Sequence, residues 1–369
     1  MANPFAKILK DGLSSKKKKD SAESVVGIDI GTSAIKVVQL RRKGGKAVLE
    51  TYGTLALGPY AKGDVGQVTN LSAEDLAKAM TDTLRESNVT SSNCAIAIPA
   101  SSSLIFTMEL PGIIEEKTLE QVIPTEARKY IPVPISEVSL DWSVIPKATS
   151  DEEGTVEKNE ILVAAIHNDT VARYRSLASS AKLNAAFFEI EVFSSIRSVL
   201  THDLSTVMIV DIGASKTKIT IMEYGTVKRF HIINRGSQDI TNNLSKSLAI
   251  PFTRAEEIKR ETGLSRNVQD QAIPDTIKLV MDYIFGEANS VLLDYERKYN
   301  KIVSKVILTG GGSLLKEIIA DAKTTFRNDV VLGTPFDKVE APAFLGDVLK
   351  DAGPEFSVAV GLALRELEG

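Results

Sequence analysis

Two stretches of this chain repeat one order of residue types. Val25–Leu40 and Val207–Met222 each contain an apolar run that meets Asp-Ile-Gly, passes through Thr-Ser or Ala-Ser, and continues in β-rich sequence. Each pattern predicts a buried strand, a short turn and a returning strand. The repetition predicts two related halves, and a pair of such hairpins can hold one ligand from opposite sides.

The two turns carry groups that suit a phosphate. Gly31 and Gly213 allow the backbone to approach a bulky group and to take a positive φ, and successive N–H groups in such turns form an anion nest. Asp29 and Asp211 lie at the predicted strand ends, where a carboxylate can hold Mg²⁺ through its waters. The hydroxyl and amine groups that follow belong to Thr32, Ser33, Ser215, Lys36, Lys216 and Lys218. One such hairpin fits a plain polar turn equally well, but two favour a nucleotide site.

Other phosphate-binding patterns are missing from the sequence, and two weaker signals are present. The chain has neither a Walker-type phosphate loop nor the Gly-x-Gly-x-x-Gly fingerprint. Val306–Ile318 predicts a strand, a triple glycine and a helix, an arrangement that can approach phosphates or form only a tight connection. Thr253–Thr262 predicts a helix that ends at a glycine. Glu256 and Lys259 share one face of it, as a surface ion pair would.

Taken in chain order, these segments resemble the actin, sugar-kinase and DnaK-type ATPase superfamily. The hairpins are similar to its two phosphate motifs, and Thr309–Ser313 is similar to its adenosine motif. Phe187–Leu200 and Phe356–Leu367 resemble its two connecting helices. The resemblance covers nearly all of the chain from Val25 onward. It implies an α/β, actin-like (ribonuclease H-like) fold with two lobes and ATP between them.

A closer resemblance, to the PilM family of type IV pilus assembly proteins, lies in the middle of the chain. The segments that carry it are Met108–Gly112, Glu126–Pro134, Val138–Trp142 and Glu160–Ala165. That family is a cytoplasmic relative of the cell-division protein FtsA, and both have a small extra subdomain called 1C. The resemblance implies a first lobe at 25–103, an inserted α+β subdomain at 104–183 and a second lobe at 184–369. The closing helix, 356–367, is expected to pack back towards the first lobe.

The superfamily resemblance also implies roles for single residues. Asp29 and Asp211 would be the magnesium-side carboxylates, and Glu189 or Glu191 would position the attacking water. The sequence does not decide between those two glutamates. ATP and Mg²⁺ are the expected cofactors, and slow turnover with the nucleotide mainly as a conformational ligand is as consistent with the sequence as fast hydrolysis. The implied nucleotide contacts are Gly31, Thr32, Ser33, Lys36, Gly213, Ala214 and Ser215 at the phosphates, Glu256 and Lys259 at ribose and base, and Gly310, Gly311 and Gly312 at the adenosine.

The insertion contains an apolar segment that two prolines stiffen. Pro132 and Pro134 prevent it from continuing the preceding helix or lying in a central strand. The segment fits a rigid loop on the core as well as one wall of a peptide cleft; its residues are Tyr130, Ile131, Pro132, Val133 and Pro134. The family resemblance implies that such a cleft, between subdomain and first lobe, binds the N-terminal cytoplasmic segment of an inner-membrane PilN-type protein. Other pilus assembly components of the inner membrane are further expected partners.

Composition narrows the remaining possibilities. The formal net charge of −4 gives no reason to expect a nucleic-acid partner. No apolar run is long enough to span a bilayer, and no signal peptide is recognisable. The family resemblance implies a location in the cytoplasm, peripheral to the inner face of the membrane. Residues 1–24 are expected to be a flexible basic leader, or a weak contact with anionic lipid.

The leading interpretation is an actin-like, ATP-binding adaptor of type IV pilus or competence assembly. The alternative is a cell-division filament protein of the FtsA kind, a family that normally continues into a linker and an amphipathic helix. A small-molecule kinase of the same superfamily is less favoured, because no candidate base accompanies a second pocket. Outside the motifs, the periodicity predicts helices at 72–87, 115–130, 169–181 and 274–299, and strands at 46–57, 94–100, 138–145 and 159–166.

Overall fold

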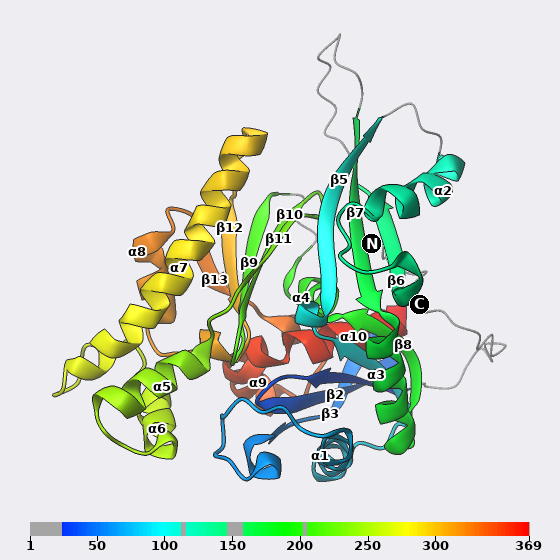
Figure 1. Ribbon diagram of the computed structural model, residues 1–369. Coiled ribbons are helices and arrows are strands. Elements are labelled where there is room, and N and C mark those ends of the chain that lie inside the picture. Colours follow the sequence, from blue (N-terminus) through cyan, green and yellow to red (C-terminus); the bar gives the residue numbers. More distant parts are fainter. Residues whose placement is uncertain (1–23, 112–115, 146–157, 202–204, 369) are drawn as a thin grey trace.

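The structure is a computed structural model that describes residues 24–111, 116–145, 158–201 and 205–368. The predicted leader therefore lies outside the described residues up to residue 23, as does Gly112 of the insertion motif. Figure 1 shows the arrangement of the elements, with the N-terminal lobe in blue and the closing helix in red.

Each of the two repeated segments is the centre of its own sheet. The first sheet has the strand order β3-β2-β1-β4-β8, in which β1 is antiparallel to β2 and parallel to β4. The second has the order β11-β10-β9-β12-β13, in which β9 is antiparallel to β10 and parallel to β12. The strands are β1 (Ser24–Ile30), β2 (Ala34–Lys43), β3 (Lys46–Ala56), β4 (Asn93–Ile98), β8 (Asn184–Ile190), β9 (Val207–Ile212), β10 (Thr217–Glu223), β11 (Thr226–Ile233), β12 (Lys305–Thr309) and β13 (Asp329–Leu332).

Helices cover both faces of the first sheet. Alternate residues of a strand point to opposite faces, and in β1 Val26 and Ile28 join a core with residues of α1 (Ala73–Glu86) and α3 (Asn168–Ser180). The other face of β1 packs against α10 (Ser357–Glu368). One face of the second sheet packs on the long α7 (Ala272–Tyr299), together with α5 (Ser237–Ser247), α6 (Phe252–Thr262) and α8 (Ile318–Thr325). Residues of α4 (Glu191–Val199) share a core with its other face, and α9 (Gly346–Ala352) packs in the core that surrounds α10.

Two glycines allow α10 to lie very close to its neighbours. A Cβ at Gly27 of β1 would come within 2.0 Å of the Ala359 carbonyl oxygen, and a Cβ at Gly361 would come within 1.8 Å of the Ser194 carbonyl oxygen on α4. Both contacts are with backbone, so a side chain at either position would push α10 away from the first sheet or from α4. The closing helix thus packs closely against both β1 and α4.

The inserted segment forms a small subdomain of its own. Its sheet has the order β5-β7-β6, all antiparallel, and α2 packs on it. Ile131 lies in this core together with Ile123 of α2 and Val163 of β7. The elements are β5 (Ser103–Pro111), α2 (Glu116–Ala127), β6 (Val138–Val144) and β7 (Lys158–His167).

A polar cluster ties the subdomain to the second lobe. Glu160 of β7 accepts a hydrogen bond from the Tyr299 hydroxyl at the end of α7, at 2.8 Å, and pairs with Lys228 of β11. Both charged side chains are largely buried, so the link lies inside the junction of the two parts. In Figure 1 the strands β5 and β11 run beside one another at this junction.

Two sequence expectations are corrected by the sheet topology. Phe187–Leu200 was expected to be one helix, but its first residues belong to β8, which pairs in parallel with β4, and α4 begins only at Glu191. Because β8 is an edge strand of the first sheet, the boundary expected at 184 does not separate the two sheets. In addition, the triple glycine leads into a short 3₁₀ turn, Gly311–Leu314, before α8 begins at Ile318.

Candidate functional site

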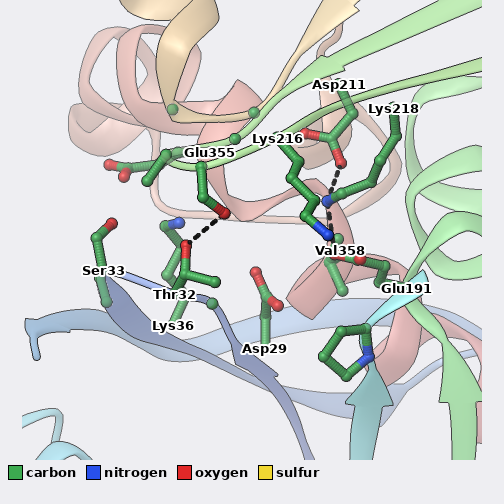
Figure 2. Close-up of a pocket in the computed structure, with 18 of the residues that line it drawn as sticks. Asp29, Thr32, Ser33, Lys36, Glu191, Asp211, Lys216, Lys218, Glu355 and Val358 are labelled. Carbon is green, nitrogen blue, oxygen red and sulfur yellow. Dashed lines mark hydrogen bonds and ion pairs between the residues drawn. The ribbon is translucent and has the colours of Figure 1, made fainter. Parts of the chain in front are cut away.

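A cleft lies between the turns of the two repeated hairpins. Its walls include both Asp-Ile-Gly turns, the first two residues of the triple glycine, and the start of α10 (Figure 2). The predicted residues that line it are Asp29, Gly31, Thr32, Ser33, Lys36, Glu191, Asp211, Gly213, Ala214, Ser215, Gly310 and Gly311. The fold thus brings most of the expected site together from segments far apart in the chain.

The two turns have the same backbone geometry. The Gly31 N–H donates to the Ala34 carbonyl at 3.0 Å, and the Gly213 N–H donates to the Lys216 carbonyl at 2.9 Å. A Cβ at either glycine would come within 2.9 Å of that carbonyl oxygen. Neither glycine has a positive φ, which corrects one of the two reasons given for them. Their function in the turn is to allow this close approach.

Both turns leave backbone donors available at the cleft. Within the residues that the structure describes, the N–H groups of Thr32, Ser33, Ala214 and Ser215 have no intramolecular acceptor. The Thr32 hydroxyl donates to the Ser215 hydroxyl at 3.2 Å, so the two turns touch across the cleft. Free N–H groups and hydroxyls that converge from two sides form a site for a multiply charged anion.

Three charged side chains form a compact group on the second-lobe side. The Lys218 ammonium donates to Glu191 Oε2 at 2.6 Å and to Asp211 Oδ2 at 2.9 Å (Figure 2). Glu191 also accepts the Ala100 N–H at 2.8 Å through its other oxygen. Burial disfavours the charged lysine, but Asp211 and Glu191 outweigh it and hold the pKa of Lys218 above its usual value. The lysine therefore stays protonated between the two carboxylates.

Asp29, the corresponding carboxylate on the first-lobe side, has a raised pKa. It stands opposite Lys36 in the β1–β2 register, as Asp211 stands opposite Lys218 in β9–β10. No side chain in the described part of the structure donates a hydrogen bond to Asp29. Burial raises the pKa of Asp29 to about 6, and the nearby positive charge of Lys36 offsets only part of that increase.

The triple glycine borders the cleft through backbone. Gly310 has a φ of 81°, and a Cβ there would come within 2.3 Å of Asp211 Oδ1. Its N–H donates to the Pro354 carbonyl at 2.9 Å, which attaches the turn to the segment before α10. Gly311 has open space around its Cβ position, whereas Gly312 packs on Ile212 and does not line the cleft.

Three further predicted residues lie away from the cleft. Glu189 is buried in β8, where it pairs with Arg197 of α4 and Arg365 of α10. Burial opposes its charge, but the two arginines hold the pKa of Glu189 below its ordinary value. Of the two glutamates that the sequence could not separate, Glu191 faces the cleft and Glu189 joins the connecting helices.

Glu256 and Lys259 pair with one another on α6, at 2.6 Å, and both are buried. The Thr241 hydroxyl donates to Glu256, and Gly66 of the segment between β3 and α1 packs against the same carboxylate. That segment therefore lies over the position expected to face ribose and base. The i, i+3 spacing showed that the two side chains share a face but not which way the face points.

Sequence reasoning did not single out several residues of the cleft. The start of α10 contributes Ser357 and Val358, the 3₁₀ turn just before it contributes Glu355, and the segment after β4 contributes Pro99 and Ser101. Lys216 and Lys218 were noted only as positive charge. The signal that could have found the Lys218 pairing is its position seven residues after Asp211, the same offset as Lys36 from Asp29.

The groups that line the cleft fit some of the ligands that the fold implies. The free N–H groups, hydroxyls and lysines of the two turns fit a polyphosphate. Asp29 fits a hydrated Mg²⁺, because its carboxylate is open to the cleft. Asp211 does not, since one oxygen pairs with Lys218 and the other lies against Gly310. Among the described residues, no group of three or more His, Cys, Asp or Glu side chains is placed to hold a metal ion.

The predicted partner-peptide residues lie at the surface and the core of the subdomain. Tyr130 is 51% exposed and stacks on Phe106, with ring centroids 4.9 Å apart. Pro132 and Pro134 are exposed, Val133 is half-buried and Ile131 is buried. In the part of the chain that the structure describes, we found no helix both long and apolar enough to cross a membrane.

The repeated sheets, the cleft between them and the two connecting helices define a two-lobed, actin-like α/β protein. MreB 5 of Spiroplasma citri, solved with AMPPNP bound, shares this fold (12% identity, 94% of this chain and 97% of that chain, TM-score 0.50). A solved PilM–PilN type IV pilus biogenesis complex contains a more similar chain (24% identity, 95% and 100% covered, TM-score 0.79). The family profile described as type IV pilus assembly protein PilM matches residues 27–367. The chain belongs to that family, which is actin-like and related to FtsA.

Curated relatives of this chain are cell-division FtsA proteins. FtsA of Neisseria meningitidis serogroup B is 28% identical over 205 residues, which are 49% of this chain and 48% of that protein. FtsA of Pseudomonas aeruginosa is 23% identical over 391 residues, covering 94% and 90%. The match thus spans about half the length of the first relative and nearly all of the second.

Proposed function

We propose that this protein is a nucleotide-dependent adaptor of type IV pilus or competence assembly. It binds ATP in the cleft between its lobes, at the inner face of the cytoplasmic membrane. Its inserted subdomain binds the N-terminal cytoplasmic peptide of a PilN-type inner-membrane protein. The observation that carries this proposal is that two phosphate-type turns, one from each sheet, face one shared cleft.

The nucleotide acts mainly as a conformational ligand in this proposal. A triphosphate between the turns contacts both lobes at once, so it favours the closed arrangement by its differential affinity. Bound Mg²⁺ would neutralise phosphate charge, and Asp29 is the residue that would hold its waters. Glu191 is the proposed water-positioning residue, but its pairing with Lys218 and Ala100 favours slow hydrolysis.

Lysine replacements on the first hairpin test the nucleotide site. Lys36→Met removes a positive charge from the cleft, and we expect it to weaken binding of a fluorescent ATP analogue by about tenfold, the usual effect of losing one charge-assisted contact. Lys46→Met, at the exposed start of the neighbouring strand β3, is the matched control and should leave the affinity unchanged. The nucleotide site is refuted if the unmodified protein does not bind the analogue.

The partner site is supported by family membership and by the exposed aromatic surface of the subdomain. Tyr130 stacks on Phe106 beside two exposed prolines, so it presents a rigid apolar patch that loses little entropy when a peptide covers it. The PilM of the solved complex binds PilN, and the proposal extends that pairing to this chain.

A peptide titration tests the partner site. We expect the synthetic N-terminal segment of the PilN-type protein to bind, and Tyr130→Ala to weaken it by about tenfold or more, as for an aromatic anchor. Tyr224→Ala removes a comparably exposed tyrosine from the second lobe and serves as control. Equal losses in both variants, or no binding of the peptide at all, would refute this assignment.

The similarity to FtsA keeps a second candidate in view, a filament-forming division protein. ATP-dependent polymerisation detected by pelleting and electron microscopy would favour it. A protein that stays unassembled with ATP while retaining the peptide favours the adaptor.

A further inference from the structure

We propose that Lys218 takes the place of a divalent cation on the second-lobe side of the cleft, so that the affinity for nucleotide depends little on Mg²⁺, including the hydrated ion that Asp29 would hold. The inference rests on the proposed nucleotide site and specifies how that site is charged. Its basis is the geometry of Lys218, Asp211 and Glu191, which come from β10, β9 and α4.

The two carboxylates already share one ammonium group. Lys218 lies 2.6 Å from Glu191 Oε2 and 2.9 Å from Asp211 Oδ2, and all three side chains are at most 15% exposed. The second oxygen of Glu191 accepts the Ala100 N–H. The second oxygen of Asp211 lies against Gly310. A cation that approached the two oxygens that face one another, Glu191 Oε2 and Asp211 Oδ2, would have to displace the ammonium.

The first hairpin is an internal comparison within the same molecule. Lys36 occupies the position opposite Asp29 that Lys218 occupies opposite Asp211. In the described residues, however, no hydrogen bond joins Lys36 to Asp29. One repeat thus leaves its carboxylate open, whereas the other closes it with a lysine. The difference comes from α4, because its Glu191 is a second carboxylate that helps to hold the Lys218 ammonium.

An ammonium group in this position can also act on the ligand. Lysine has three N–H donors, and two of those on Lys218 are directed at Asp211 and Glu191. The third is available to a phosphate oxygen in the cleft that Lys218 lines. The protein thus supplies, as a fixed side chain, a positive charge between carboxylate and phosphate that a metal ion would otherwise supply.

The test compares nucleotide affinity in excess EDTA and in excess Mg²⁺. For the unmodified protein we expect fluorescent ADP to bind with affinities within about threefold of each other in the two buffers, a difference of less than 1 kcal/mol. Lys218→Gln removes the fixed charge, so we expect its affinity in EDTA to fall by about tenfold or more and Mg²⁺ to restore most of the loss. Lys216→Gln is the matched control, because this cleft lysine has no ion pair within the described residues. Its affinity should fall by the same factor in both buffers.

A second measurement needs no nucleotide. Titration with Mn²⁺, followed by electron paramagnetic resonance, should detect no site on the unmodified protein that depends on Asp211. Lys218→Gln should gain such a site, and Lys218→Gln combined with Asp211→Asn should lose it again.

The outcomes separate this inference from the proposed function. An unmodified protein whose affinity rises tenfold or more with Mg²⁺, or which binds Mn²⁺ through Asp211, overturns the role of Lys218. If Lys218→Gln does not fold, these measurements on the unmodified protein decide the matter. A protein that binds no nucleotide in either buffer overturns the nucleotide site, and the Mn²⁺ titration then still decides whether Lys218 blocks a metal.

Discussion

Asp29 is a carboxylate that folding keeps partly uncharged. Its pKa rises from 3.8 to about 6, mainly because the end of β1 is buried at the base of the cleft. A raised pKa in the folded state means that the unfolded chain loses its proton first as the pH increases. The associated stability is thus fully present below pH 3.8 and is lost as the pH rises to about 6.

We therefore expect Asp29→Asn to stabilise the fold above pH 6. The gain in the free energy of unfolding should reach about 2–3 kcal/mol at pH 8 and vanish near pH 4. Urea unfolding at both pH values measures it, with Asp294→Asn on the exposed face of α7 as control. A gain that is equal at the two pH values would show that burial of the charge is not the cause.

The direction of a side chain could be predicted from the sequence where it follows from the position of the residue along a hairpin. Asp29 and Lys36 point to one face because their register pairs them, and the same holds for Asp211 and Lys218. The sequence could not predict that Lys218 would meet Glu191, since that contact depends on how α4 packs beside the second sheet. Nor could it show that the Glu256 carboxylate would be covered by the segment around Gly66.

Among the elements, α10 has close packing that requires glycine at two positions. Gly361 brings it against α4, and Gly27 brings β1 against it. A methyl group at Gly361 has no free volume to occupy, because a backbone carbonyl is the atom it meets. Overpacking of this kind is absorbed by movement of whole elements rather than by rotation of a side chain.

Gly361→Ala should consequently destabilise the fold by about 1–3 kcal/mol. Gly286→Ala, in the middle of α7, meets nothing within 4 Å, so it should stabilise the fold by about 0.5–1 kcal/mol through helix propensity alone. Thermal or urea unfolding of the two variants makes the comparison. The packing argument fails if both substitutions shift stability in the same direction.

The prediction of elements failed where pairing partners decide the conformation. The stretch before Glu191 is apolar and aromatic, and it suits a buried strand or a buried helix. Its alignment in parallel with β4 makes it β8. By contrast, α1 was predictable from local signals, because Ser72 caps it by accepting the Asp75 N–H, and α7 was predictable from its long apolar stripe.

For the whole molecule, the important feature is that the lobes touch at the cleft. The Thr32 and Ser215 hydroxyls are in contact, and the segment between β3 and α1 reaches the second lobe, where the Val68 N–H donates to Gln238 of α5. We therefore expect these contacts to open before a ligand occupies both turns.

Stopped-flow binding should reveal this order of events. We expect the observed association rate to level off at high nucleotide concentration, at the rate of opening. Gln238→Ala removes one link between the lobes and should raise that plateau, whereas Gln67→Ala, whose side chain bonds within the same segment, should not. A rate that rises linearly over the whole concentration range would mean that opening is not required.

The helix α7 connects the two ends of the second lobe as a rod. Its 28 residues give it a length of roughly 42 Å. Near its start it packs against α5, whose first N–H groups donate to the carbonyls of Gly213 and Ala214 in the second turn. Its last residue, Tyr299, is bonded to Glu160 of the inserted sheet. We expect a force on a membrane partner that pulls on that sheet to change the affinity of the second turn for its ligand. By the same coupling, bound ligand should make the inserted sheet more rigid.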